Sequence, residues 1–142
     1  MQTLVLLPGD ARSGAIEPAM KTRHFRDLQI WRRSMALARE IYDATERFPK
    51  SEMFGLASQM RRSAVSVPSN IAEGHGRLSD KSFAQFLGNA RGSLFELETQ
   101  IELACSLGFI ERNRSEPLLL EVNEIARMMN GLLNRIAGEA AG

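Results

Sequence analysis

The sequence contains few of the residues that metal centres and nucleophilic sites require. Its 142 residues include one cysteine and two histidines. A single cysteine forms no internal disulfide, and these three potential ligands are too few for a tetrahedral zinc site. Neither His24 nor His75 follows a glutamate by three residues, which excludes the Glu-x-x-His pairs of di-metal helical bundles. We therefore expect no metal and no cofactor.

Long apolar runs are also missing. No stretch approaches the roughly 20 apolar residues that span a bilayer, so we expect no membrane partner. The short apolar run at residues 4–7 has no Lys or Arg before it and is stopped by Pro8, unlike the core of an export signal. Cys105 lies in an apolar, helix-patterned stretch, which favours a buried, reduced thiol. These features predict a cytoplasmic protein.

Patterns that would indicate an enzyme are weak. No glycine-rich phosphate loop occurs, and Cys105 has no histidine near it in the sequence. Glu96, Glu98 and Glu102 fall within one helical stretch and could be an acid/base set, but a solvated acidic side is the commoner meaning of such a cluster. We expect a protein that is not an enzyme.

The apolar pattern is helical throughout, and the length fits one domain. Apolar residues recur at three- and four-residue steps in four segments, at about 27–48, 51–74, 79–108 and 115–137. No strand-like alternation appears and the connections are short, so the sequence predicts an all-α, antiparallel up-and-down four-helix bundle. The expected divisions are a flexible N-terminal extension at 1–24, the bundle at 25–137 and a frayed tail at 138–142. Met20 is an alternative start.

Four residues predict where helices begin or bend. Ser51, Ser79 and Ser115 are expected N-caps, because a serine hydroxyl accepts a hydrogen bond from an unpaired amide of the first turn. Pro68 lies inside the second segment, where it removes an amide donor and crowds the preceding turn. We expect a kink or a restart of the helix there.

Five glycines carry further predictions. Gly74 and Gly76 are expected to leave the second helix through left-handed dihedrals, and Gly108 is expected to end the third. Gly88 and Gly92 each cost about 0.5–1 kcal/mol inside a helix relative to alanine, so they predict a close helix approach.

The first helical segment carries more apolar surface than one bundle core needs. Two rows of apolar residues cover about half of its circumference, against the ~100° arc of a core-facing helix. The row expected in the core is Leu28, Trp31, Met35, Ala38 and Tyr42. A soluble protein rarely leaves a large apolar patch in water, so the surplus predicts a homo-oligomer. The expected oligomer interface is Ile30, Leu37, Ile41 and the off-row Phe95.

Basic and acidic residues are unevenly distributed. Up to Arg91 the sequence has 14 basic and 9 acidic residues, whereas the remainder has 4 basic and 8 acidic. Arginine predominates in the basic half, and its forked donors suit phosphate. Because the second helix would return beside the first, we expect a shared arginine face that binds nucleic acid. The expected residues of this face are Arg23, Arg26, Arg32, Arg33, Arg61 and Arg62.

Several separated motifs in one order indicate a known family. They are FRDLQIW at 25–31, QMRR at 59–62, SVPSNIAEG at 66–74 and ARGSLFELET at 90–99. Over about residues 25–133 the chain resembles the bacterial four-helix bundle proteins named for 23S rRNA intervening sequences. Asn89 stands where an apolar residue is usual, and the segment up to about residue 23 is additional. The motif residues singled out are Asn70, Glu73, Gly74, Arg77, Gly92, Ser93, Glu96 and Glu98. For Asn70, Glu73 and Arg77 we prefer a structural role at the end of the second helix to ligand contact.

The resemblance implies an up-and-down bundle and suggests partners. Members of this family and the similar accessory variability determinant of diversity-generating retroelements form ring-like homopentamers, and that determinant binds a reverse transcriptase and nucleic acid. Three hypotheses follow: an oligomeric scaffold that binds RNA, DNA or a nucleoprotein partner, a purely protein-binding or structural homo-oligomer, and, last, an enzyme. Salt-dependent binding of nucleic acid separates the first from the second.

Overall fold

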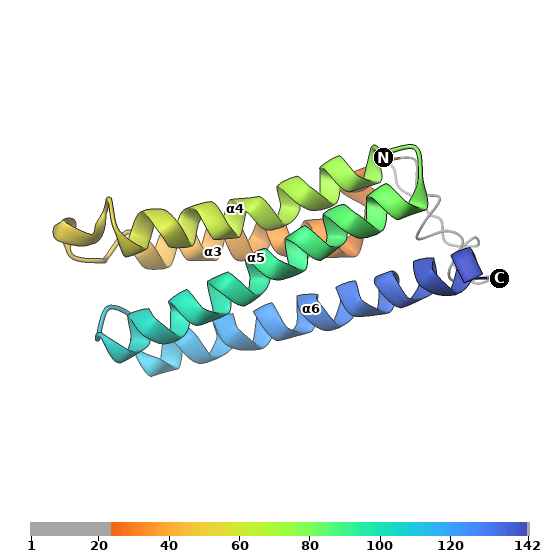
Figure 1. Cartoon of the computed structure of the whole chain (residues 1–142). Helices are drawn as coiled ribbons and strands as arrows, with labels where there is room; N and C mark the ends of the chain where they lie inside the picture. The colour runs from red at the N-terminus through yellow and green to blue at the C-terminus, as the bar shows by residue number, and fades with distance from the viewer. Residues whose placement is uncertain (1–23, 142) are drawn as a thin grey trace.

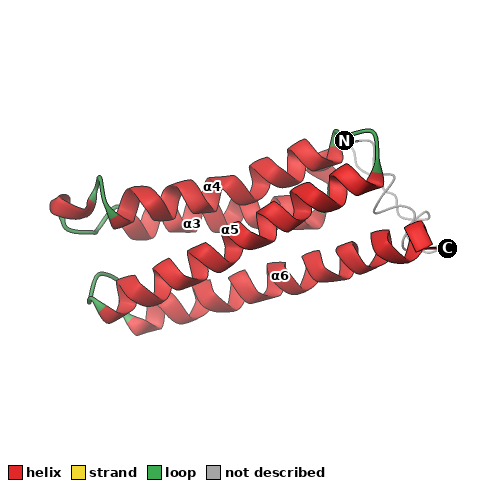
Figure 2. Cartoon of the chain, viewed as in Figure 1, coloured by secondary structure: helices red, strands yellow, loops and turns green. Residues whose placement is uncertain are grey.

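Four long helices dominate the structure, a computed structural model that describes residues 24–141. They are α3 (Gln29–Thr45), α4 (Leu56–His75), α5 (Asp80–Ser106) and α6 (Arg112–Ala141). Two short 3-10 turns, η1 (Phe25–Asp27) and η2 (Lys50–Glu52), precede α3 and α4. Within this part of the chain every regular element is helical, as Figure 2 shows.

Successive helices run in alternating directions and are joined by short loops at the two ends of the molecule (Figure 1). α3 packs against α4 and α6, and α5 packs against α4 and α6, so the helix axes form a four-membered bundle. The predicted all-α, up-and-down four-helix bundle is confirmed.

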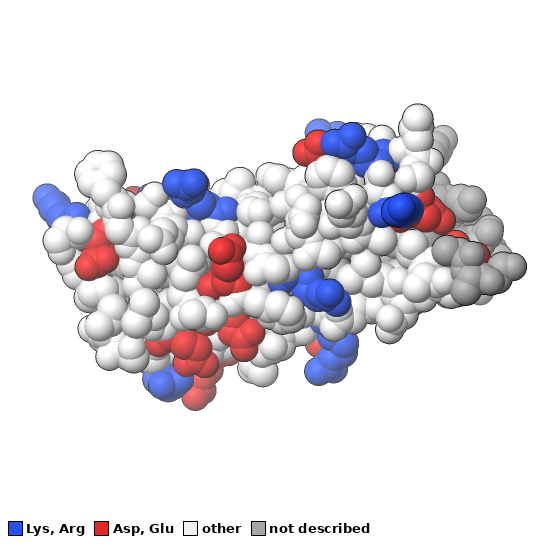
Figure 3. Space-filling model, in the orientation of Figure 1, with Lys and Arg blue, Asp and Glu red and all other residues white. Residues whose placement is uncertain are grey.

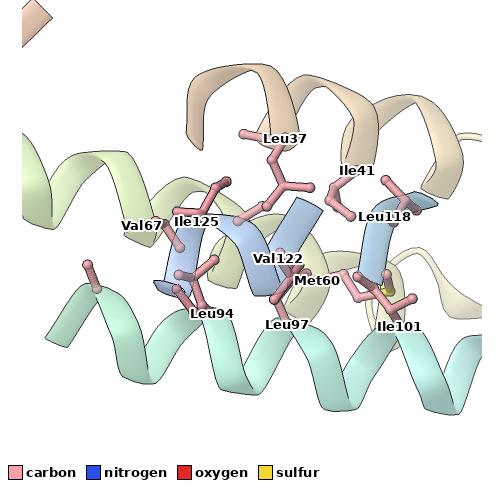
Figure 4. Packing of buried hydrophobic residues seen from close by; sticks show 14 of the residues in the cluster. Leu37, Ile41, Met60, Val67, Leu94, Leu97, Ile101, Leu118, Val122 and Ile125 are labelled. Atoms are coloured by element: carbon pink, nitrogen blue, oxygen red, sulfur yellow. The ribbon is translucent and has the colours of Figure 1, made fainter. Parts of the chain in front are cut away.

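Apolar side chains from all four helices fill the centre, and Figure 4 shows them pointing toward one another. In α5 two rows of apolar residues that repeat every seven positions in the sequence are both buried, as knobs-into-holes packing requires. These rows are Phe83, Ala90, Leu97, Ala104 and Leu87, Leu94, Ile101. α5 is therefore the element whose buried face the sequence predicts best.

The bundle core takes up the α3 residues predicted for the oligomer interface, and of the predicted core row it takes up Leu28 and Ala38 but not Met35 or Tyr42. Ile30, Leu37 and Ile41, expected at an oligomer interface, are at most 5% exposed and belong to the bundle core. Met35 and Tyr42, expected in the core, are 40% and 46% exposed. The assignment was wrong because both rows follow a helical period, and the period alone does not say which row faces the other helices.

The beginning of α5 agrees with the sequence, and that of α4 does not. Ser79 Oγ accepts a hydrogen bond from the Ser82 amide at 3.1 Å, which is the predicted N-cap. α4 begins only at Leu56, whose amide donates to Glu52 Oε1 at 3.3 Å. Ser51 lies in η2 instead, so its predicted capping role is wrong.

α6 begins at Arg112, before the predicted start at Ser115. The Ser115 amide donates to the Glu111 carbonyl at 2.9 Å, and Ser115 Oγ donates to the Arg112 carbonyl at 3.2 Å. Ser115 is thus an internal, buried residue of the first turns and not a cap.

At the other end α6 continues to Ala141, beyond the predicted end of the bundle at 137. The predicted extension at 1–24 lies almost wholly outside the described residues.

α4 is one helix from Leu56 to His75, so the chain does not restart at the buried Pro68. The C-cap, Gly76, has a φ of −79°, and the predicted left-handed exit is wrong. Gly74 lies inside the helix, where a Cβ atom would come within 2.6 Å of Phe86 Cβ. This glycine therefore serves the close approach of α4 and α5.

Candidate functional site

An apolar groove runs between α3 and α4 and has a volume of about 830 Å³. Its lining includes the small or buried residues Ala38 and Pro68 and, beside them, Met35, Tyr42 and Val65, each at least 40% exposed. The row of α3 that was expected in the core thus forms one side of the groove. The wide apolar arc of the first helical segment correctly indicated an exposed apolar surface. The residues predicted for that surface, Ile30, Leu37 and Ile41, are instead buried.

Arg61 closes one end of the groove. Its guanidinium lies over the Tyr42 ring, 4.7 Å from the centroid, and its Nε donates to Thr45 Oγ1 at 2.8 Å. It also pairs with Glu46 at 3.5 Å, and its side chain is only 21% exposed. These contacts join α4 to α3. Because they occupy the guanidinium of Arg61, few of its donors remain for a phosphate.

Arg33 is likewise occupied by a partner in the chain. Its Nε and one terminal nitrogen donate to the two carboxylate oxygens of Glu121 on α6, at 2.8 and 2.7 Å. Both side chains are 32% exposed. The hydrogen bond to Glu121 raises the pKa of Arg33, and partial burial opposes this shift. The pair links α3 to α6 and faces away from α4.

The remaining predicted arginines within the described residues, Arg26, Arg32 and Arg62, are exposed. Arg32 is 64% exposed, donates to the Arg26 carbonyl at 2.8 Å and lies 3.8 Å from Asp27. Arg62 is exposed on α4, and within the described residues it makes no hydrogen bond or ion pair. Arg23 lies outside those residues. In Figure 3 the basic side chains of the visible face are separated by acidic and uncharged surface. Of the arginines expected on the basic face, Arg33 and Arg61 are held by carboxylates within the bundle.

The motif residues of α4 and α5 meet along the contact between these helices. Ser66 Oγ and Ser93 Oγ are 2.8 Å apart, within hydrogen-bond distance. Asn70 Nδ2 donates to the Ser66 carbonyl at 2.9 Å and to Ser66 Oγ at 3.0 Å. A hydroxyl–hydroxyl contact needs small side chains on both helices. This set fixes the register of α4 against α5.

A second contact joins the same helices near the end of α4. Arg77 donates to Glu73 Oε2 at 2.7 Å, and its guanidinium lies over the Phe86 ring, 4.8 Å from the centroid. With Gly74, which lets Phe86 come close, these residues tie the end of α4 to α5. The contacts of Asn70, Glu73 and Arg77 fit the structural role that the sequence favoured for them.

The other motif residues lie on the outer surface of α5. A Cβ atom on Gly88 or Gly92 would have no neighbour within 4 Å, so neither glycine marks a close approach within the described chain, and that prediction was wrong for one bundle. Glu96 is exposed and Glu98 is half-buried. Phe95, expected at an oligomer interface, is 49% exposed.

The sequence analysis missed two further exposed residues, Leu103 on α5 and Leu107 at its C-cap, which are 47% and 53% exposed. They lie outside the two buried heptad rows, and this position in the sequence pattern could have identified them as exposed.

Ser115 Oγ lies 3.5 Å from Cys105 Sγ, and no histidine hydrogen-bonds to either residue within the described chain. The described residues contain no group of three or more His, Cys, Asp or Glu that could hold a metal. No helix among them is both long and apolar enough to cross a membrane.

These features define a small up-and-down four-helix bundle protein with an exposed apolar groove between α3 and α4. The chain belongs to the 23S rRNA-intervening sequence protein family, whose model matches residues 26–131, and the family inferred from the motifs is confirmed. No curated protein matches the sequence. A crystal structure of a protein with unknown function from the S23 ribosomal protein family of Bacteroides thetaiotaomicron has a similar fold, with a TM-score of 0.69 and 23% sequence identity. The match covers 73% of this chain and 97% of that one, and at this identity it shows the fold alone.

Proposed function

We propose that this protein is a non-enzymatic scaffold that assembles into a homo-oligomer through its exposed apolar surfaces. The observation that carries the proposal is the groove between α3 and α4, where Met35, Tyr42 and Val65 stay at least 40% exposed side by side. Contiguous apolar surface of this kind marks a contact site for another protein surface. The motif residues Ser66 and Ser93 support the same proposal, since their hydroxyls meet in the contact between α4 and α5 and neither residue lines the groove.

Sedimentation equilibrium over a wide range of micromolar concentrations tests this proposal. The expected mass is a multiple of 15.8 kDa, and the family resemblance favours five copies. A mass of one chain at every concentration would overturn the proposal.

A second candidate function is the binding of RNA, DNA or a nucleoprotein partner such as a reverse transcriptase. The observation that favours it is the exposure of Arg26, Arg32 and Arg62, whose guanidinium groups are not held in strong pairs as Arg33 and Arg61 are. In a symmetric oligomer these arginines repeat, so a modest charge per chain becomes multivalent. The family name supports the same direction, because it refers to intervening sequences of 23S rRNA.

Fluorescence anisotropy with labelled RNA and DNA of mixed sequence, at low salt, tests this second function. We expect binding that weakens steeply with salt and shows little base preference, because phosphate contacts release counterions. No binding at low salt would remove it and leave the protein scaffold.

A further inference from the structure

We propose that copies of this chain join head to tail, with the outer face of α5 in one copy seated in the α3/α4 groove of the next. This inference rests on the proposed homo-oligomer and names the two faces that form it. The occupant of the groove is then a second copy of this chain.

The exposed large apolar residues of the helices fall mainly into two stripes on different sides of the molecule. One stripe lines the groove and consists of Met35, Tyr42 and Val65. The other follows α5 and consists of Phe95, Leu103 and Leu107. α5 packs against α4 and α6, so its outer face is separate from the groove between α3 and α4. Because the two patches lie on different sides of the molecule, they cannot both face the same neighbour, and each can cover the other only through a heterologous contact.

One face has a projecting side chain and the other is a groove. Around Phe95 the surface of α5 is low, because Gly88 and Gly92 carry no side chain and a Cβ atom at either position would lie in open space. Phe95 therefore projects as a knob from a helix whose backbone can come close to a neighbour. Thr99 Oγ1 donates to the Phe95 carbonyl at 3.0 Å, so burial of this face would leave no unpaired threonine hydroxyl. The groove offers the small residue Ala38 at its buried side.

The two faces also lie at matching heights along the bundle. Ser66 on α4 is level with Ser93 on α5, since their hydroxyls touch, and Arg61 on α4 is level with Tyr42 on α3. With a rise of about 1.5 Å per residue, Phe95 lies between these two levels. If neighbouring bundles stand side by side, Phe95 of one copy comes level with Tyr42 and Val65 of the next.

Charge favours the same arrangement. Exposed Glu96 and Glu102 flank the stripe on α5, and exposed Arg39 lines the groove. Within the described residues none of these three side chains is ion-paired. The acidic groups that also line the groove are already neutralised, because Asp43 pairs with Arg114 at 3.0 Å and Glu46 pairs with Arg61. The groove therefore offers a free positive charge to an acidic neighbour.

A complementation experiment tests the assignment of the two faces. Phe95→Glu damages only the α5 stripe, and Val65→Glu damages only the groove. Each variant alone is expected to sediment as a monomer of 15.8 kDa with unchanged helical circular dichroism. An equimolar mixture is expected to form a one-to-one dimer, because the first variant keeps an intact groove and the second keeps an intact stripe. A contact of one patch with itself would not be restored by mixing.

Leu120→Glu is the matched control, since Leu120 is 72% exposed on α6 and lies outside both stripes. It should assemble like the wild type. If a variant does not fold, Leu103→Glu replaces Phe95→Glu, and Met35→Glu replaces Val65→Glu. A monomeric wild type would overturn the proposed oligomer itself. An oligomeric wild type whose folded variants keep its mass, or whose monomeric variants do not pair, would overturn only the head-to-tail arrangement.

Discussion

Gly74 shows how one missing side chain sets the distance between two helices. An alanine Cβ at this position would lie 2.6 Å from Phe86 Cβ and 3.1 Å from Phe83 Cδ1. Phe86 Cβ is bonded to the backbone and cannot swing aside, so Gly74→Ala must push α4 and α5 apart. We expect the free energy of unfolding to fall by about 1–3 kcal/mol in urea denaturation.

The control for this change is Gly131→Ala in α6, where a Cβ atom would meet nothing within 4 Å. Replacing a helical glycine in open space by alanine should raise the free energy of unfolding by about 0.5–1 kcal/mol. If both variants were stabilised alike, the close approach at Gly74 would be contradicted.

The Arg33–Glu121 pair gives a second prediction at this scale. Glu121→Gln removes the carboxylate that holds both donors, and because the pair is about a third exposed we expect a loss of only about 1 kcal/mol. The pKa of Arg33 is raised by folding, so its contribution is complete below the unfolded pKa and disappears only as pH rises through the folded one. Urea denaturation at neutral and mildly alkaline pH should give the same loss. Asp27→Asn, which removes the exposed 3.8 Å contact with Arg32, should change stability very little.

The end of α5 shows most clearly how a few neighbouring residues determine where a helix stops. Gly108 has a φ of +82°; its amide donates to the Cys105 carbonyl at 3.0 Å, and the Phe109 amide donates to the Ala104 carbonyl at 2.9 Å. This is a Schellman motif, in which glycine is favoured. Gly108→Ala should lower the free energy of unfolding by about 1–2 kcal/mol, because a Cβ atom strains the left-handed conformation. Gly108→Asn should lose less in the same urea experiment, and equal losses would contradict the role of the dihedral.

The helices could be predicted from the sequence wherever local residues decide the outcome. The cap at Ser79 and the stop at Gly108 depend on a few neighbouring residues, and the heptad rows of α5 contain apolar residues at every core position. Ser115 shows the limit of such rules, because a serine hydroxyl also pairs inside a helix with the carbonyl three residues earlier. The number, type and order of the helices were therefore predictable, and some of their starts were not.

The surfaces depend on partners far away in the sequence, and this is why they were predicted less well. The two rows of α3 are equally periodic, so the choice between Leu37 and Met35 as a core residue is made by the packing of α4 and α6. Arg33 was expected to face a nucleic acid, but its partner Glu121 is 88 residues away along the chain. Helical position alone does not reveal such a contact.

At the scale of the whole molecule, the charge of one bundle is close to balance, at +1 over the full sequence. A single chain with dispersed arginines is a weak ligand for a phosphate backbone, since affinity grows with the number of phosphates contacted. Repetition of Arg26, Arg32 and Arg62 around an oligomer changes this, because several weak contacts then act on one strand. The proposed binding of nucleic acid therefore depends on the proposed assembly, and we expect the monomeric variants described above to lose both.

The exposed arginines can be separated from the paired ones in a final experiment. We expect the triple change of Arg26, Arg32 and Arg62 to Ala to leave the fold and the oligomer intact and to weaken binding of RNA and DNA alike. The salt slope on a DNA duplex should fall by about 0.9 for each phosphate that the variant no longer neutralises. Arg33→Ala should instead reduce stability and leave the slope unchanged, because its guanidinium is engaged by Glu121. Anisotropy titrations at several salt concentrations, together with urea denaturation of each variant, measure both effects. Identical slopes for the wild type and the triple variant would mean that these arginines do not contact phosphate, and the apolar groove would then be the principal binding surface of the bundle.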